Sequence, residues 1–152
     1  MSEKARGGLF NALGDIDGLT VLDAFAGSGA LSFEAISRGA KHAVAIDNDS
    51  NAVKAMSKAA NGLGVSQQTK ITQAGISAWS NNNPEARFDI VLCDPPFDEL
   101  KIALIQKLTL HTTSLMVLSW PGNLEVPELE GMELVKDKNY GDNQLVFYRR
   151  IV

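Results

Sequence analysis

Apolar runs alternate with helically spaced segments along most of this chain, and no other feature constrains its fold as strongly. Buried strands are predicted over residues 19–25, 42–47, 70–74, 88–94 and 114–120. Helices are predicted over residues 3–13, 30–38, 50–63 and 98–108. Strands that are joined by helices run parallel, with the helices packed on the sheet. The pattern therefore predicts an α/β fold with an open, mostly parallel sheet and helices on both faces.

The last part of the chain departs from this alternation. Two strand-like segments, residues 132–140 and 144–150, flank the turn sequence Gly141-Asp142-Asn143. They predict a hairpin that adds an antiparallel element to the edge of the sheet. Asn81–Pro84 is polar and turn-prone and is predicted to be a loop. No repeat or linker interrupts the sequence, so residues 1–152 are expected to form a single domain.

The composition narrows the class of protein. Hydrophobic residues make up 45% of the chain and charged residues 21%, as in an ordinary soluble domain, and the net charge is -4. This balance excludes a strongly basic nucleic-acid-binding protein, so any positive patch must be local. No apolar run reaches the roughly 18 residues of a membrane span, and the single cysteine, Cys93, has no disulfide partner. Because no Cys/His spacing is typical of a zinc site either, we expect a cytoplasmic protein without a metal.

A glycine-rich turn follows the first predicted strand. Phe25-Ala26-Gly27-Ser28-Gly29 lies between that strand and the next helix, and Asp23 stands just before it. The glycines allow a tight turn and close approach of a ligand, and the N–H groups that open the helix favour an anionic group such as a carboxylate. Asp47 ends the second strand, where its carboxylate can accept two hydrogen bonds from a ribose diol.

Three interpretations compete for this turn. A nicotinamide-cofactor site has a similar second acid, but it has a third glycine where this chain has Ser32 and lacks an early acid such as Asp23. A tight strand–helix connection without any ligand is the second interpretation, and the two acids weigh against it. The order Asp-x-Phe-x-Gly-x-Gly is the style of turn that binds S-adenosylmethionine. In that case Asp23 would orient the turn or contact the ammonium group of the cofactor.

Asp94-Pro95-Pro96-Phe97 closes the strand predicted over residues 88–94. Neither proline can donate to a strand ladder, so the strand ends there in a rigid segment. The Asp94 carboxylate and the Pro95 carbonyl can accept the two N–H bonds of an exocyclic amino group, while Phe97 stacks on the base. We expect these residues to position an amine for methyl transfer, with Asp94 stabilising the charge that develops on nitrogen. A strand that merely ends in a rigid turn is the alternative interpretation.

These motifs give the chain a resemblance to a known family. Residues 4–13, 21–31, 34–40 and 88–97 are similar to the RsmD-like family, the bacterial 16S ribosomal RNA guanine-N2 methyltransferases. The resemblance implies a Rossmann-like class I methyltransferase sheet of seven strands with S-adenosylmethionine as its cofactor. It also implies methylation of guanine N2 in 16S ribosomal RNA, either free or in the assembled small subunit, by a monomer.

Two departures from the family pattern qualify this expectation. Family members usually carry a basic, RNA-contacting segment ahead of residues 4–13, and we expect that segment to lie outside this chain. The family also places an acid after the third strand to contact adenine, whereas residues 73–77 contain none. Ser77 or backbone groups would then contact the adenine instead. The residues expected to bind the cofactor are Asp23, Phe25, Ala26, Gly27, Ser28, Gly29, Asp47, Asn48 and Ser77.

Other functions stay open at this point. An amino methyltransferase that acts on DNA adenine or on a protein side chain would use the same two motifs. A cofactor-binding module that is inactive without the family's N-terminal segment is a further alternative.

Overall fold

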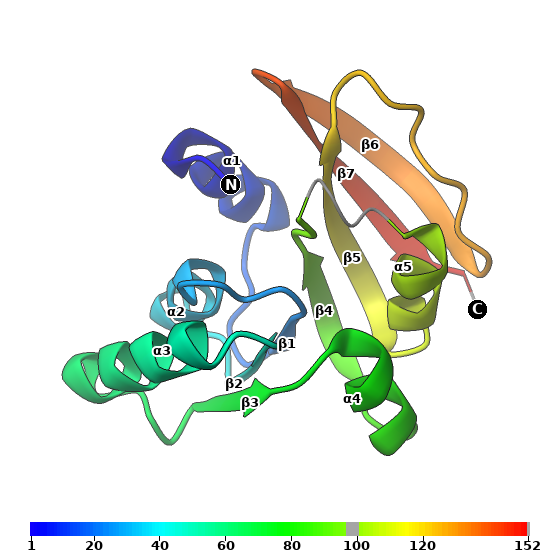
Figure 1. The fold of residues 1–152 in the computed structure, drawn as a ribbon. Helices are drawn as coiled ribbons and strands as arrows, with labels where there is room; N and C mark the ends of the chain where they lie inside the picture. The colour runs from blue at the N-terminus through cyan, green and yellow to red at the C-terminus, as the bar shows by residue number, and fades with distance from the viewer. Residues whose placement is uncertain (97–100, 152) are drawn as a thin grey trace.

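The computed structural model describes residues 1–96 and 101–151 (Figure 1). Its helices are α1 (Glu3–Leu13), α2 (Ala30–Ser37), α3 (Ser50–Leu63), α4 (Ile76–Asn82) and α5 (Ile102–Thr109). Its strands are β1 (Thr20–Asp23), β2 (His42–Asp47), β3 (Thr69–Gln73), β4 (Phe88–Cys93), β5 (Thr112–Pro121), β6 (Met132–Tyr140) and β7 (Asn143–Arg150). None of the helices in these two ranges combines the length and the apolar character needed to cross a membrane.

The seven strands form one sheet in the order β3-β2-β1-β4-β5-β7-β6. The five strands from β3 to β5 run parallel, while β7 is antiparallel to both β5 and β6. The predicted mostly parallel sheet with an antiparallel edge hairpin is therefore confirmed. The strand order reverses between β1 and β4, because the chain first moves outward through β2 and β3 and then returns to the other side of β1.

Helices cover both faces of the sheet, as predicted. Figure 1 shows α1, α2 and α3 on one face and α4 and α5 on the other. The alternation of side chains along each strand divides the core in the same way. In β7, Leu145 and Phe147 pack in the core under α1 and α2, while Val146 and Tyr148 pack in the core under α4 and α5.

Local signals explain where several helices begin and end. The Ser2 hydroxyl accepts a hydrogen bond from the Ala5 N–H and caps α1, and the Asp49 carboxylate caps α3 through the Asn51 N–H. Gly64, with φ +72°, ends α3 in the left-handed conformation that glycine adopts without strain. The predicted helices over residues 3–13 and 50–63 are confirmed with the same limits.

The loop predicted at Asn81–Pro84 is wrong in its first half. Asn81 and Asn82 form the last turn of α4, whose Ile76 and Trp79 are buried against the sheet. Burial of these two large side chains outweighs the turn preference of the asparagines. The other predicted elements differ only at their ends, and residues 98–100 of the helix predicted over 98–108 lie outside the described residues.

Candidate functional site

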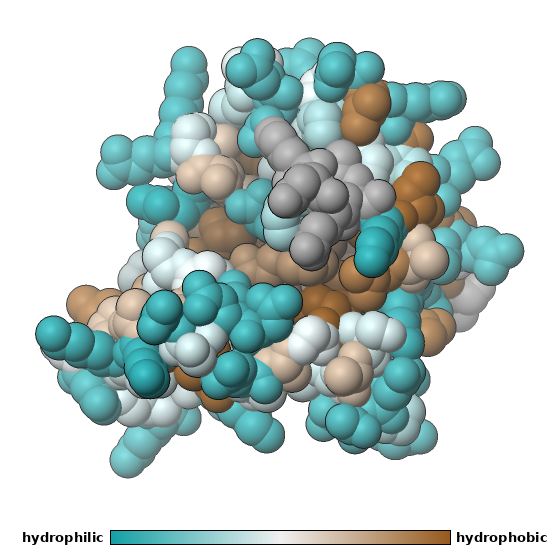
Figure 2. Space-filling view, viewed as in Figure 1, coloured by the Kyte–Doolittle hydropathy of each residue, from teal (hydrophilic) through white to brown (hydrophobic). Residues whose placement is uncertain are grey.

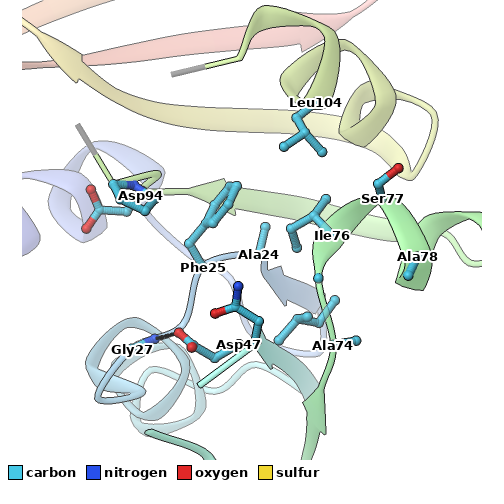
Figure 3. A pocket seen from close by; sticks show the side chains of 14 residues that line it. Ala24, Phe25, Gly27, Asp47, Ala74, Ile76, Ser77, Ala78, Asp94 and Leu104 are labelled. Carbon is cyan, nitrogen blue, oxygen red and sulfur yellow. Dashed lines mark hydrogen bonds between the residues drawn. The ribbon is translucent and has the colours of Figure 1, made fainter. Parts of the chain in front are cut away.

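A cavity of about 630 Å³ opens at the carboxyl ends of the parallel strands, where the strand order reverses. Ligands of open α/β sheets bind at this position, because the loops there diverge and leave a crevice. Figure 3 shows residues from the end of β2, from the segments that follow β1 and β4, and from the start of α4 around the same space. The floor of the hollow is apolar and polar residues surround it (Figure 2).

The glycine-rich turn connects β1 to α2 along one wall of the cavity. Gly27 and Gly29 have φ values of +56° and +82°, which side-chain-bearing residues rarely adopt. A Cβ atom at Gly29 would also lie 2.7 Å from the Phe33 ring and 2.9 Å from Cγ of Met56. Gly29 begins α2 without a side-chain cap. The turn therefore needs glycine at position 29 for two separate reasons, the backbone conformation and the lack of space.

Asp47, at the end of β2, is fixed by two backbone donors. Its Oδ2 accepts a hydrogen bond of 2.8 Å from the Gly27 N–H, and its Oδ1 accepts one of 2.9 Å from the Asp49 N–H. The carboxylate thus ties the glycine-rich turn to β2 while it lines the cavity. Because each carboxylate oxygen has a second lone pair, both oxygens can still accept a ligand's hydroxyl groups. The predicted role toward a ribose stays a prediction.

Asp23, the last residue of β1, lies beneath the turn and is fully buried. Its Oδ2 accepts a hydrogen bond of 2.7 Å from the Ser32 hydroxyl in the first turn of α2, and its Oδ1 has no partner among the described residues. Burial raises the pKa of Asp23 to about 6, and the nearby Asp94 and Asp47 charges add to the rise, against the hydrogen bonds from Ser32. Asp23 is therefore bonded to α2 through one carboxylate oxygen, while its two predicted roles, orienting the turn and contacting an ammonium group, stay predictions.

Asp94 follows β4 and lines the cavity, and in Figure 3 its carboxylate points to the left, away from Phe25. Its side chain is 23% exposed, and its Oδ2 lies 3.3 Å from the amino group of Met1, next to the start of α1. Pro95 is buried, while Pro96 is exposed and lines the cavity. No donor within residues 1–96 and 101–151 is hydrogen-bonded to the Pro95 carbonyl. Phe97 lies outside the described residues.

The sequence model of the family described as Conserved hypothetical protein 95 matches residues 1–149 of this chain. The chain belongs to this family, the RsmD-like class I methyltransferases. Ribosomal RNA small subunit methyltransferase D of Haemophilus influenzae is 31% identical to it over 135 residues, which cover 84% of this chain and 68% of that protein.

Solved structures extend the comparison to the fold of this RsmD-like chain. The yhhF protein from Escherichia coli, described as a candidate methyltransferase, has a TM-score of 0.89 and 26% identity, with 99% of this chain and 88% of that chain covered. Magnesium protoporphyrin IX methyltransferase from Synechocystis PCC 6803, solved with bound SAM, shares the fold at 20% identity. Its TM-score is 0.72, with 97% of this chain and 77% of that chain covered.

The RsmD-like cavity brings together many, but not all, of the residues predicted to form the site. Those that line it are Phe25, Gly27, Asp47, Asn48, Ser77, Asp94 and Pro96. Those that do not line it are Asp23, Ala26, Ser28, Gly29 and Pro95. Within the two described ranges, no group of three or more His, Cys, Asp or Glu residues is arranged to hold a metal ion.

Part of the cavity wall was not predicted. Its apolar side consists of residues from four separate segments, namely Ala24, Ile46, Ala74, Gly75, Ile76, Ala78 and Leu104. Except for Leu104 and Ala78, these residues lie at the ends of parallel strands or directly after them, and that position is the signal that could have identified them. Ser77 stands beside this wall, and its hydroxyl accepts a hydrogen bond of 3.1 Å from the Lys107 ammonium group.

Proposed function

We propose that this RsmD-like protein transfers the methyl group of S-adenosylmethionine to N2 of a guanine in 16S ribosomal RNA. One observation supports the proposal: the turn held by Asp47 and the segment with Asp94 and Pro96 line a single cavity at the switch point of the sheet. The similarity to the small subunit methyltransferase of Haemophilus influenzae supports the choice of ribosomal RNA.

The cavity suits S-adenosylmethionine in size and in charge. Its volume of about 630 Å³ lies within the usual range for small-molecule sites. Asp47 and Asp94 line it and Asp23 lies just beneath, so a ligand with sulfonium and ammonium charges is favoured. The apolar wall formed by Ile46, Ala74 and neighbouring residues fits a flat adenine ring. We therefore assign the ribose to Asp47 and the adenine to the wall beside Ser77.

The chain's own residues then have simple tasks. When bound, the cofactor supplies an electrophilic methyl group on sulfur. The Asp94 carboxylate and the Pro95 carbonyl accept the two N–H bonds of the guanine N2 amine and aim its nitrogen at that methyl group. Asp94 also stabilises the positive charge that develops on nitrogen as the new bond forms. In this proposal Phe97 stacks on the base, which has to leave its helical stack to enter the site.

The test is methyl transfer from labelled cofactor to small ribosomal subunits that lack the modification, with nucleoside mass spectrometry of the product. We expect N2-methylguanosine from the unaltered chain and at least a hundredfold lower turnover from Asp94→Asn, since positioned acid–base and electrostatic groups contribute on that scale. Glu85→Gln is the matched control, because it makes the same carboxylate-to-amide change at an exposed site before β4.

Three outcomes would contradict the proposal. N6-methyladenine or a methylated protein side chain as the only product would reassign the substrate to DNA or protein. Equal turnover by the unaltered chain and Asp94→Asn would remove Asp94 from the site. Cofactor binding without turnover on any substrate would favour a binding module that depends on another segment.

A further inference from the structure

A second groove, of about 290 Å³, lies between α1 and the edge hairpin formed by β6 and β7. On one side it is lined by Gly8, Asn11 and Ala12 of α1, and on the other by Lys136, Lys138 and Tyr140 of β6. These positions contain two cations and no acid. That is unusual for a chain whose net charge is -4.

The alternation of side chains along β6 explains why positive charges gather on the face of the strand that is turned toward α1. Lys136, Lys138 and Tyr140 alternate along β6 and point toward α1, so Asp137 between them points to the opposite face. Glu133, the other acid of β6, is paired with Arg149 at 2.9 Å. On the α1 side of the hairpin, Lys136 and Lys138 therefore form no ion pair with an acid among the described residues.

The two lysines are also held in place. The Lys136 ammonium lies 5.1 Å from the centre of the Phe147 ring, and the Lys138 ammonium lies 5.4 Å from the centre of the Tyr140 ring. Tyr140 itself rests on α1 at Gly8, where any Cβ atom would overlap its hydroxyl. Aromatic contacts of this kind restrict the lysine side chains and leave their ammonium groups exposed, so less conformational freedom is lost when an anion binds.

The groove is connected to the catalytic cavity through α1. The Met1 amino group lies 3.3 Å from Asp94, while Gly8 contacts Tyr140 seven residues later. From Glu3, the first residue of α1, to Gly8 the helix rises by about 8 Å, so the groove begins about one and a half helical turns beyond the end of α1 that lies next to Asp94. A strand that leads away from a base bound at Asp94 would pass over this groove.

We propose that the groove between α1 and the β6–β7 hairpin binds the phosphate backbone of the RNA strand next to the target base, with Lys136 and Lys138 each contacting one phosphate. This inference rests on the proposed function, because it takes RNA as the substrate. Two lysines held against aromatic rings suit contacts to phosphate, which position a strand without reading its sequence.

The test compares the double variant Lys136→Gln/Lys138→Gln with Lys54→Gln/Lys58→Gln. The control removes the same two charges from α3, whose lysines are exposed near the opposite edge of the sheet (Figure 1). Binding of a fluorescein-labelled single-stranded RNA of mixed sequence is measured by anisotropy across a range of salt concentrations. Calorimetry with S-adenosylhomocysteine and methylation of unmodified small subunits are measured in parallel.

Loss of two phosphate contacts should flatten the dependence of log affinity on log salt by about 1.4 and weaken RNA binding roughly tenfold near 0.15 M salt. The KM for the subunit should rise by a similar factor, with unchanged turnover at saturation and unchanged binding of S-adenosylhomocysteine. An unaltered salt slope, or an equal loss in the α3 control, would overturn the groove proposal and leave the proposed function intact. Absence of methylation by the unaltered chain would instead count against the proposed function.

Discussion

The substitution Asp23→Asn should make the protein more stable at neutral pH. Asp23 is fully buried, and the pKa of its carboxyl is raised from 3.8 to about 6. At about 1.4 kcal/mol for each pKa unit, ionising this group in the folded protein costs about 3 kcal/mol at neutral pH. Asparagine keeps an oxygen that can accept the hydrogen bond from Ser32 and removes the buried charge.

The sign of the pH dependence follows from the same shift. Between about pH 4 and pH 6 the unfolded chain loses its Asp23 proton while the folded protein keeps it. The folded state therefore binds more protons in this window, and stability falls as the pH rises through it. The stability advantage of Asp23→Asn should grow from under about 1 kcal/mol at pH 4 to about 3 kcal/mol at pH 7.5.

Urea unfolding at several pH values measures this difference. A change of about 3 kcal/mol moves the midpoint by at least 1 M for a denaturant slope of about 1–3 kcal/mol per molar. Asp142→Asn, at an exposed turn, is the control and should change stability little at any pH. The reasoning is refuted if Asp23→Asn is no more stable than the unaltered protein at pH 7.5, or if its advantage does not vary with pH.

Two further predictions concern the glycine-rich turn and Asp47, which binds the turn to β2. Gly29→Ala should destabilise the protein by about 2–4 kcal/mol, because an alanine there would be strained at its backbone and would also overlap Phe33 and Met56. Gly64→Ala is the control, since it has a similar backbone strain but open space around the added methyl group. Equal losses of stability for the two variants in urea unfolding would disprove the contribution from overlap. Asp47→Ala should abolish measurable binding of S-adenosylhomocysteine in calorimetry, since it leaves the Gly27 N–H without its acceptor and removes the proposed ribose acceptor. An affinity within twofold of that of the unaltered chain would contradict the assignment of Asp47 to the ribose.

The sequence predicted the elements whose ends carry local signals. Ser2 and Asp49 cap α1 and α3 with their own side chains, and Gly64 ends α3, so these helices could be placed to the residue. Helix α4 was missed because the local preference of Asn81 and Asn82 for turns opposes the tertiary burial of the residues before them.

Sequence analysis predicted the cavity residues that belong to one short motif. It missed cavity residues that come together from segments far apart in the sequence. Phe25 and Gly27 belong to the turn whose spacing was recognised, and both line the cavity. Ile46 and Leu104 reach the same cavity from β2 and α5, and no periodicity within either segment indicates that they approach each other. Ser32 was noted only as a missing glycine, yet its hydroxyl holds Asp23 in place.

Asp23, Asp47 and Asp94 lie close together, and their mutual repulsion bears on which ligands the site prefers. Asp47 is satisfied by two backbone donors and Asp94 lies beside a positive amino group, whereas Asp23 is buried with one oxygen unpaired. The charges of Asp47 and Asp94 make ionisation of Asp23 still harder. A cationic ligand in the cavity would lower that cost, because its positive charge would offset the charges of Asp47 and Asp94, which line the cavity. The site should therefore prefer a cation to a neutral molecule of the same shape, which favours binding of a sulfonium methyl donor over its neutral thioether product.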